Sequence, residues 1–492
     1  MVGADQKRSI LVTAGNLRNN HLYVNGNHDF FPRDCVGGAR RTAKAAAGIE
    51  IALDGLNETV ITDIGSDPKT GRPRGYFRGR TWVRKFYEHH AIQAGTVLSL
   101  EKLSERKYRL SVQPNGKPHP PGLRAAEFFS GIGLVRLALE NQGWHVVFAN
   151  DIDPDKAEMY RHTWPTDDHL VVGDIHALKP GDLPDCELFT ASFPCNDLSI
   201  AGRWEGLSGK ESSAFWGLVT LLRDLRGRRP RMVMLENVVG FLMSHGGSDF
   251  EKALLALNEL GYTVDALILN AIHWTPQSRA RLFVIAKQDE GQERRTFALA
   301  SDARPQSLID FIGRHDNIRW DIQDVPPLPA PKTKLSEIVQ DLPDDDPHWW
   351  SKERTEYFMN QMSERHANDA REMIDGKKIR YATAFRRVRN GKSMAELRTD
   401  GIAGCLRTPR GGSGRQILFK AGRGRYQVRL LTARECARLQ GVPDSYRIDV
   451  PLNQALFGFG DAVCVPAVEW IARNCLTKLS GMARSMATAA RS

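Results

Sequence analysis

The sequence lacks several features that would place it in a specialised class of protein. Its 492 residues include no run of about 18 apolar residues, so we expect no transmembrane helix. The N-terminus lacks the apolar core of a secretion signal. The seven cysteines are odd in number, scattered and without a CxxC pair, which argues against a disulfide framework and a structural zinc site. We therefore expect a reduced, cytoplasmic protein that needs no metal.

The composition and the distribution of charge narrow the choice further. With 41% hydrophobic and 26% charged residues the chain has a globular balance, and its length predicts two or three domains. Residues 1–124 contain 20 Lys and Arg against 11 Asp and Glu, and residues 351–425 contain 18 against 8. The remainder is acidic, although the net charge is +10. Two separate basic blocks favour a polyanion such as nucleic acid, and solvated basic faces are the alternative.

Changes in pattern along the chain indicate its domains. The proline-rich segment 111–122 predicts a linker. Short β-like runs bounded by Gly, Asn and Asp predict a β-rich domain, a small barrel or sandwich, over 1–110. After the linker, strands alternate with helices, which is typical of a doubly wound α/β sheet. The expected strands are 123–129, 145–151, 170–175, 186–193, 231–238, 262–270 and 281–287. Regularity fades from about 290 to 427, and helical patterns return at 431–441 and 461–476.

Three of the expected strands end in residues that suit a nucleoside-containing ligand. Residues 129–133, Phe-Ser-Gly-Ile-Gly, follow the first strand and open a helix, where glycine lets the backbone approach a ligand closely. Asp151 ends the second strand, where a carboxylate can accept hydrogen bonds from ribose hydroxyl groups. Asp174, beside Ile175, is expected to end the third. A tight turn that simply needs glycine is the alternative for residues 129–133.

The next strand ends carry reactive groups. Cys195 follows Pro194 at the end of the fourth strand, where a thiol is exposed as a nucleophile, although a free cysteine is more often a small buried apolar residue. Glu236 ends the fifth strand, and a partly desolvated carboxyl there can donate a proton. Its alternatives are a helix cap or a local salt bridge. Arg279 and Arg281 lie on one face of an extended segment and offer planar hydrogen-bond donors. The alternative for these two arginines is a solvated charged edge.

In this order the motifs resemble those of the DNA (cytosine-5)-methyltransferase family. The similar blocks are residues 129–133, 150–153, 173–175, 193–195, 236–238, 277–281, 429–443 and 460–466. The resemblance implies an S-adenosylmethionine-dependent methyltransferase fold with S-adenosylmethionine as methyl donor. The implied cofactor-binding residues are Phe129, Ser130, Gly131, Gly133, Asp151, Ile152, Asp174 and Ile175. Among these, Asp151 would bind the ribose, Ile152 would pack on the adenine and Asp174 would accept the adenine amino group.

The same resemblance implies the catalytic residues. Cys195 would attack cytosine C6, Glu236 would act as the acid at N3, and Arg281, supported by Arg279, would hold the O2 side. The base must leave the duplex to reach the thiol.

The chain departs from the family pattern at Leu134, Ser192, Asn196 and Asp461. None of these departures removes a reacting group. The extra carboxylate at Asp461 is expected to weaken binding of a cofactor that itself carries a carboxylate.

The resemblance also implies how the remaining segments serve the core. Residues 123–290 and 428–482 would form the catalytic domain, 291–427 an inserted target-recognition region, and 483–492 a tail. Segments 385–390 and 408–416 are candidates for DNA contacts, and 429–443 is expected to brace the recognition region. The N-terminal block resembles, weakly, a B3-type DNA-binding pseudobarrel, with an ordinary β domain as the alternative.

The function implied is site-specific methylation of cytosine C5 in double-stranded DNA through a covalent Cys195–C6 adduct. A role in a restriction–modification or related defence system, with a partner nuclease, follows from the family analogy alone. Two alternatives stay open on the sequence: an RNA (transfer RNA) cytosine-5 methyltransferase of the same fold, and a non-catalytic DNA-binding regulator.

Overall fold

A computed structural model of the chain divides into two compact units. The first is Met1–Pro121 with Trp164–His169, and the second is Gly122–Thr163 with Leu170–Ser492. The structure describes residues 7–12, 14–24, 30–40, 42–56, 58–68, 70–90, 92, 96–112, 123–165, 169–194, 213–389, 391–408 and 414–479. The predicted tail and nearly all of the predicted linker lie outside these residues.

The first unit is built on a mixed five-stranded sheet in the order β1-β6-β7-β2-β3. Its strands are β1 (Lys7–Leu11), β2 (Ile49–Leu53), β3 (Glu58–Thr62), β6 (Val97–Lys102) and β7 (Lys107–Val112). Alternate residues of β2 are buried, as expected of a strand with one face on a core. A two-stranded ribbon, β4 (Ile64–Ser66) with β5 (Pro73–Phe77), and the helices α1 (Ala14–Asn19) and α2 (Arg80–His89) complete the unit.

The β-rich character predicted for this unit is therefore present. Among the described residues the sheet ends at β1 and β3 and does not close into a barrel.

The second unit contains the predicted α/β sheet, with seven strands in the order β10-β9-β8-β11-β12-β14-β13. The strands are β8 (Arg124–Phe128), β9 (His145–Asp151), β10 (Leu170–Val172), β11 (Leu188–Ala191), β12 (Met232–Val238), β13 (Tyr262–Asn270) and β14 (Ala280–Gln288). Neighbouring strands are parallel except for β14, which is antiparallel to both β12 and β13. The seven expected strands are thus all present.

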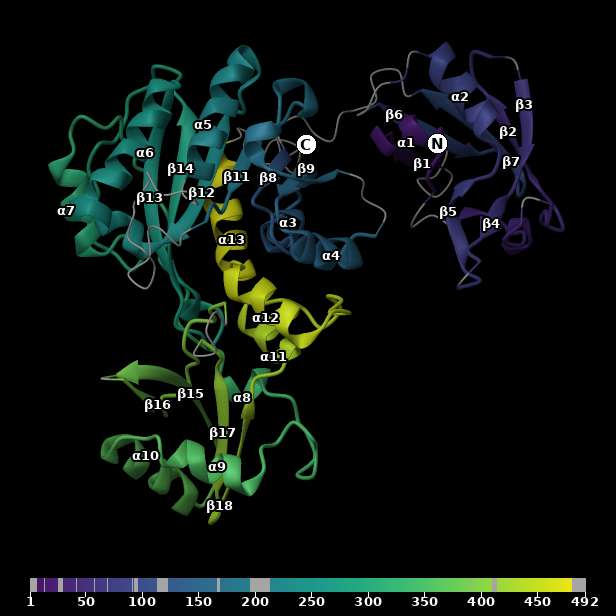
Figure 1. Cartoon of the computed structure of the whole chain (residues 1–492). Coiled ribbons are helices and arrows are strands. Elements are labelled where there is room, and N and C mark those ends of the chain that lie inside the picture. Colours follow the sequence, from purple (N-terminus) through teal and green to yellow (C-terminus); the bar gives the residue numbers. More distant parts are fainter. Residues whose placement is uncertain are drawn as a thin grey trace, which may run out of the picture. The chain divides into compact units, whose positions relative to one another are not determined.

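Helices cover this sheet (Figure 1). The strands β11 and β13 are almost continuously buried, which requires packing on both faces. On one face α5 and α6 enclose the largest apolar cluster, while α3 packs against β9 and against α13. The helices are α3 (Leu134–Glu140), α4 (Pro154–Thr163), α5 (Ser213–Leu225), α6 (Ser248–Glu259), α7 (Gln306–Arg314), α11 (Ala433–Leu439), α12 (Leu452–Asp461), α13 (Val465–Ile471) and α14 (Thr477–Leu479).

Two expectations about local structure need correction. β10 ends at Val172, so Asp174 lies beyond the strand, where its carboxylate accepts the backbone N–H of His176 and caps a short 3-10 turn. Residues 290–427 are also more regular than predicted. Part of that stretch packs into the core of the second unit, because Leu308, Phe311 and Trp320 are buried in the same apolar cluster as α5 and α6.

Residues from about 350 to 430 form a module with a core of its own. The module has a four-stranded antiparallel sheet in the order β16-β15-β17-β18, with α9 and α10 packed on it (Figure 1). Its elements are α9 (Lys352–Met359), α10 (Glu364–Asp375), β15 (Arg380–Arg389), β16 (Lys392–Arg398), β17 (Ile417–Gly422) and β18 (Arg425–Leu430), preceded by α8 (Leu335–Ile338). We call residues 350–430 the inserted module.

A fully buried ion pair joins this module to the helix that follows it. Arg429 at the end of β18 contacts Glu435 on α11, with Nη2 2.5 Å from Oε1. The same carboxylate accepts the backbone N–H of Gln340 at 2.8 Å. Glu435 therefore links β18, α11 and the segment at Gln340.

One apolar stretch, 452–479, is long enough and apolar enough to cross a membrane by composition, which the sequence reading did not anticipate. Within the protein 67% of its apolar window is buried, and non-helical residues 462–464 interrupt it between α12 and α13. Burial of this kind is typical of core helices.

Candidate functional site

The turn after β8 has the backbone conformation of a ligand-binding loop. Phe129, Gly131 and Gly133 have φ values of 55°, 54° and 80°, and the non-glycine Phe129 is strained there. A Cβ atom added at Gly131 would meet no atom within 4 Å, so the space beside it is open. The buried hydroxyl of Ser130 has no hydrogen-bond partner among the described residues. An open turn beside an unsatisfied hydroxyl suits a polar ligand.

Asp151 is fixed against this turn. Its Oδ2 accepts the backbone N–H of Gly131 at 2.6 Å, and its Oδ1 accepts that of Asp153 at 2.8 Å. Burial raises the pKa of this carboxyl, and the two backbone donors oppose the rise. Its neighbour Ile152 is 65% exposed, which leaves an apolar side chain largely open to solvent next to Asp151.

The remaining two candidates for the cofactor differ in exposure. Asp174 is exposed, whereas Ile175 is buried in the apolar cluster beneath α5, close to Gly217. The side chain of Ile175 therefore packs into the core.

A lysine that the sequence reading passed over neutralises Asp461. The Nζ of Lys156 on α4 lies 2.6 Å from Oδ2 of Asp461 at the end of α12. Burial alone would lower the pKa of Lys156, but Asp461, with Asp151 and Asp153, raises it above its ordinary value. The extra carboxylate at 461 is thus held in an ion pair, which weakens the reason for expecting it to repel an anionic ligand.

Glu236 and Arg281 form an ion pair across adjacent strands. Glu236 in β12 is 6% exposed, and its Oε1 lies 3.2 Å from Nε of Arg281 in β14. Burial raises the pKa of Glu236, and Arg281, Arg279 and a hydrogen bond with Ser192 partly offset the rise. A raised pKa makes a buried carboxyl better able to hold and donate a proton than an exposed one.

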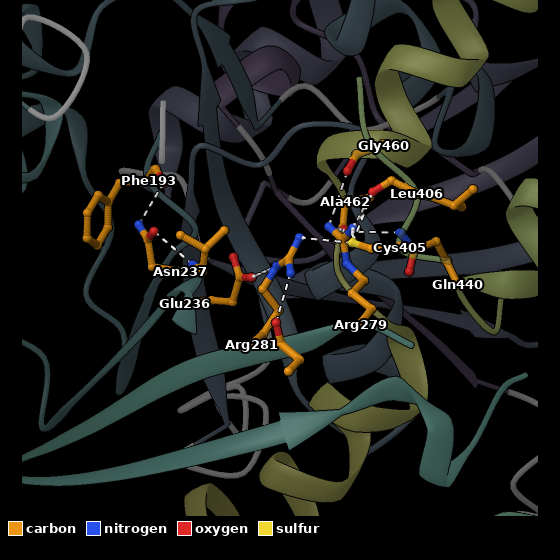
Figure 2. Close-up of polar contacts among 12 residues, drawn as sticks. Phe193, Glu236, Asn237, Arg279, Arg281, Cys405, Leu406, Gln440, Gly460 and Ala462 are labelled. Atoms are coloured by element: carbon orange, nitrogen blue, oxygen red, sulfur yellow. Dashed lines mark hydrogen bonds and ion pairs between the residues drawn. The ribbon is translucent and has the colours of Figure 1, made fainter. Parts of the chain in front are cut away.

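The residue after Glu236 fixes the segment that leads to Cys195. The amide Nδ2 of Asn237 donates to the carbonyl of Phe193 at 3.1 Å (Figure 2). Cys195 and Asn196 lie outside the described residues. The described stretch 169–194 ends one residue before the candidate nucleophile, and the next described stretch begins at Ser213.

Arg279 is held by backbone carbonyl groups (Figure 2). It is 2% exposed, and its guanidinium donates to Leu406 at 2.8 Å, Ala462 at 2.5 Å and Gly460 at 3.2 Å. It thereby ties the segment after the inserted module's β16 to the segment after α12. Arg279 and Arg281 do not act as one pair of equivalent donors, because Arg279 reaches neutral carbonyls and Arg281 reaches Glu236.

Both arginines also contact the thiol of Cys405. Its Sγ lies 3.3 Å from Nη1 of Arg279 and 3.9 Å from Nη2 of Arg281. Although burial opposes ionisation, these two cations and Arg407 lower the pKa of the thiol to about 7. No local pattern announced this contact, since the nearest of the two arginines in sequence is 124 residues away.

Comparison with known proteins decides the family. The model of the C-5 cytosine-specific DNA methylase family matches residues 123–477. The chain belongs to this family. It is 28% identical over 365 residues to the Type II methyltransferase M.HhaI of Haemophilus parahaemolyticus, covering 73% of this chain and 96% of that protein. It is 26% identical over 357 residues to M.NgoBI of Neisseria gonorrhoeae, covering 72% and 92%.

Among solved structures, the Dnmt2 methyltransferase of S. pombe is similar with a TM-score of 0.49 and 20% identity, covering 72% of this chain and 98% of that one.

The family match identifies the protein as a DNA cytosine-5 methyltransferase, and it confirms the resemblance seen in the sequence motifs. DNA is its substrate class, and the family implies S-adenosylmethionine-dependent methylation. The match begins at residue 123, so the first unit lies outside it and the B3-type resemblance stays a prediction. Among the described residues no cluster of three or more His, Cys, Asp or Glu could hold a metal ion.

Proposed function

We propose that the methyltransferase modifies one cytosine of a specific double-stranded DNA site, through a covalent adduct between Cys195 and C6 of a flipped-out base. The observation that carries this proposal is the buried Glu236–Arg281 pair, set beside the segment that Asn237 holds just before Cys195. A carboxyl and a guanidinium on neighbouring strands match the N3 and O2 edge of cytosine, and the family supplies the reaction.

The residues of this chain divide the chemistry as follows. The Cys195 thiolate gives an electron pair to C6, and N3 takes a proton from Glu236, so that C5 becomes nucleophilic. S-adenosylmethionine supplies the methyl group that C5 accepts. The C5 proton then passes to solvent, the S–C6 bond breaks, and N3 returns its proton to Glu236. Arg281 orients the base at O2, and Arg279 supports Arg281 by holding the carbonyl of Leu406, next to the Cys405 thiol that Arg281 contacts.

The turn after β8 fits the cofactor. The unsatisfied Ser130 hydroxyl and the open space at Gly131 offer a polar cradle, and Gly133 and Phe129 complete the turn. Asp151 would accept ribose hydroxyl groups, and the exposed Ile152 would cover the adenine. Asp174 would receive the adenine amino group, while Ile175 would shape the pocket through its backbone because its side chain is in the core.

We also propose that the inserted module reads the target site. Its separate core supports a unit that folds beside the catalytic sheet, and its boundaries near 350 and 430 are narrower than the 291–427 expected from sequence. The family's DNA substrate favours duplex DNA over transfer RNA and over a non-catalytic regulator. The relatives named as Type II methyltransferases support a role in a restriction–modification or related defence system, with a partner nuclease.

The test is direct. Bisulfite sequencing maps the methylated cytosines in DNA from a host that expresses the protein. A host that expresses the Cys195→Ala variant is the control. The proposal expects one recurrent sequence context carrying 5-methylcytosine in the first host and none in the second. Equal methylation in both hosts would remove Cys195 from the mechanism, and methylation of transfer RNA alone would overturn the substrate.

A further inference from the structure

Two arginines of the inserted module lie over one tryptophan, and a third lies near one of them. Arg354 comes from α9, Arg386 from the end of β15, and Arg415 from the segment before β17 (Figure 1 labels these elements). The Cζ atoms of Arg354 and Arg386 lie 4.2 Å and 5.5 Å from the centre of the Trp350 ring. Arg415 is close enough to act electrostatically on Arg354. Residues far apart in sequence therefore place three cations in one patch.

The patch has no acidic partner within the described part of the chain. No Asp or Glu oxygen there lies within 4.0 Å of any of the three guanidinium groups. Arg415 instead donates to the neutral amide of Asn453 at 2.6 Å. The buried Nε atoms of Arg386 and Arg415 have no hydrogen-bond partner among the described residues. Burial and the two neighbouring cations lower the pKa of Arg354, as expected for uncompensated like charges.

Such an arrangement is costly without an anion. Like charges repel, and buried guanidinium donors that lack acceptors lose hydrogen bonds that water would supply. Contact with the Trp350 indole restricts the guanidinium groups of Arg354 and Arg386, so less freedom is lost when a ligand binds them. A neighbouring arginine on the same strand shows the contrast, because Arg389 pairs with Glu396 at 2.6 Å.

We propose that Arg354, Arg386 and Arg415 form a binding site for a backbone phosphate of the duplex DNA substrate. This inference rests on the proposed function, since it takes the inserted module to be the part that meets DNA. The ligand chemistry follows from the donors, because guanidinium groups bind phosphate oxygens in a bidentate manner and phosphate contacts make up much of a protein–DNA interface. The site should contribute affinity and position the duplex, without setting the target sequence.

The experiment measures binding of a target-containing duplex by fluorescence anisotropy at several salt concentrations, without cofactor. The variant Arg354→Gln/Arg386→Gln is compared with Arg389→Gln, which removes a cation from the same strand that already has an acidic partner. We expect the double variant to bind roughly tenfold or more weakly at low salt, and its slope of log K against log salt to shrink by about one, as for the loss of one phosphate contact. Arg389→Gln should change both quantities little.

Equal losses in the double variant and in Arg389→Gln would show a general charge effect and overturn the site. The single variant Arg386→Lys guards against a folding defect, because it keeps the charge but loses the bidentate geometry; it should bind more weakly than wild type and melt at the same temperature. The proposal would also be contradicted if Arg386→Lys bound the duplex as tightly as wild type while the double variant proved to be unfolded. Failure of methyl transfer by the wild-type chain would sink the proposed function and leave this binding result standing.

Discussion

Arg281 lies between Glu236 and Cys405, with Nε 3.2 Å from the carboxylate and Nη2 3.9 Å from the sulfur. One guanidinium thus contacts the candidate acid on one side and a thiol of lowered pKa on the other. A cytosine that approaches Glu236 through N3 would meet Arg281 at O2, which couples the binding of the base to its protonation. Five measurements follow from this arrangement and its surroundings.

Glu236→Gln removes the proposed acid while keeping the size of the side chain. Because proton donation at N3 activates C6 for attack, we expect kcat to fall by roughly 10²–10⁴-fold. Single-turnover methyl transfer measures it. Binding of S-adenosylmethionine by calorimetry serves as the control and should stay within a few-fold of wild type. A variant with normal kcat would contradict the role of Glu236.

Ser192 tunes Glu236 through its hydrogen bond, which lowers the pKa of the carboxyl. Ser192→Gly, which restores the residue that the family pattern usually has here, removes that bond and should raise the pKa further. Since activity requires the protonated acid, the alkaline limb of the profile of kcat/KM against pH should move to higher pH. Ser192→Thr keeps the hydroxyl and should leave the limb in place. A shift of the alkaline limb to lower pH in Ser192→Gly would contradict the effect of Ser192 on the pKa of Glu236.

The Lys156–Asp461 pair allows a double-mutant cycle on cofactor binding. Lys156→Gln leaves the Asp461 carboxylate uncompensated near the proposed site of an anionic cofactor group. We expect the Kd of S-adenosylmethionine to rise by roughly tenfold, about 1.4 kcal/mol. Adding Asp461→Asn should recover most of that loss. Calorimetric titration reads the result without catalysis, and additive effects of the two substitutions would show that the pair does not act on the cofactor.

Cys405 should behave as an unusually acidic thiol. In a Cys195→Ala background, its alkylation by iodoacetamide, followed by mass spectrometry of the Cys405 peptide, should reach half of its maximal rate near pH 7, because its pKa is lowered to about 7. Arg281→Gln removes one of the cations and should move that midpoint to higher pH. A midpoint near the ordinary thiol value in both proteins would contradict the contact.

The residues that sequence could place are those fixed by strand periodicity. Asp151 and Glu236 each end an apolar run, and parallel strands bring such ends to one edge of the sheet, so their burial together was predictable. Asp174 was misplaced by a short distance because β10 is only three residues long and the 3-10 turn begins sooner.

The inserted module was hidden from the same reasoning. The buried residues of β15 are Ala382, Thr383 and Ala384, which are small and consecutive and so give no alternating apolar pattern, and three arginines follow them. The sequence also did not predict α12, which follows the inserted module. This helix contains Gly458 and Gly460, and glycine disfavours helices, although Gly458 packs closely on Ile132 and Met159. The contacts of Lys156 and of Cys405 join segments more than 100 residues apart, and no local pattern encodes them.

The most direct test of the mechanism uses a duplex that carries 5-fluorocytosine at the mapped target position. Fluorine at C5 cannot leave as a proton, so elimination stops and the Cys195–C6 bond persists. With S-adenosylmethionine present, the account predicts a complex that survives denaturing electrophoresis and whose DNA-linked peptide contains Cys195, and predicts none from Cys195→Ala. A wild-type protein that methylates ordinary DNA but leaves no denaturation-resistant complex, or one linked through Cys405, would contradict it.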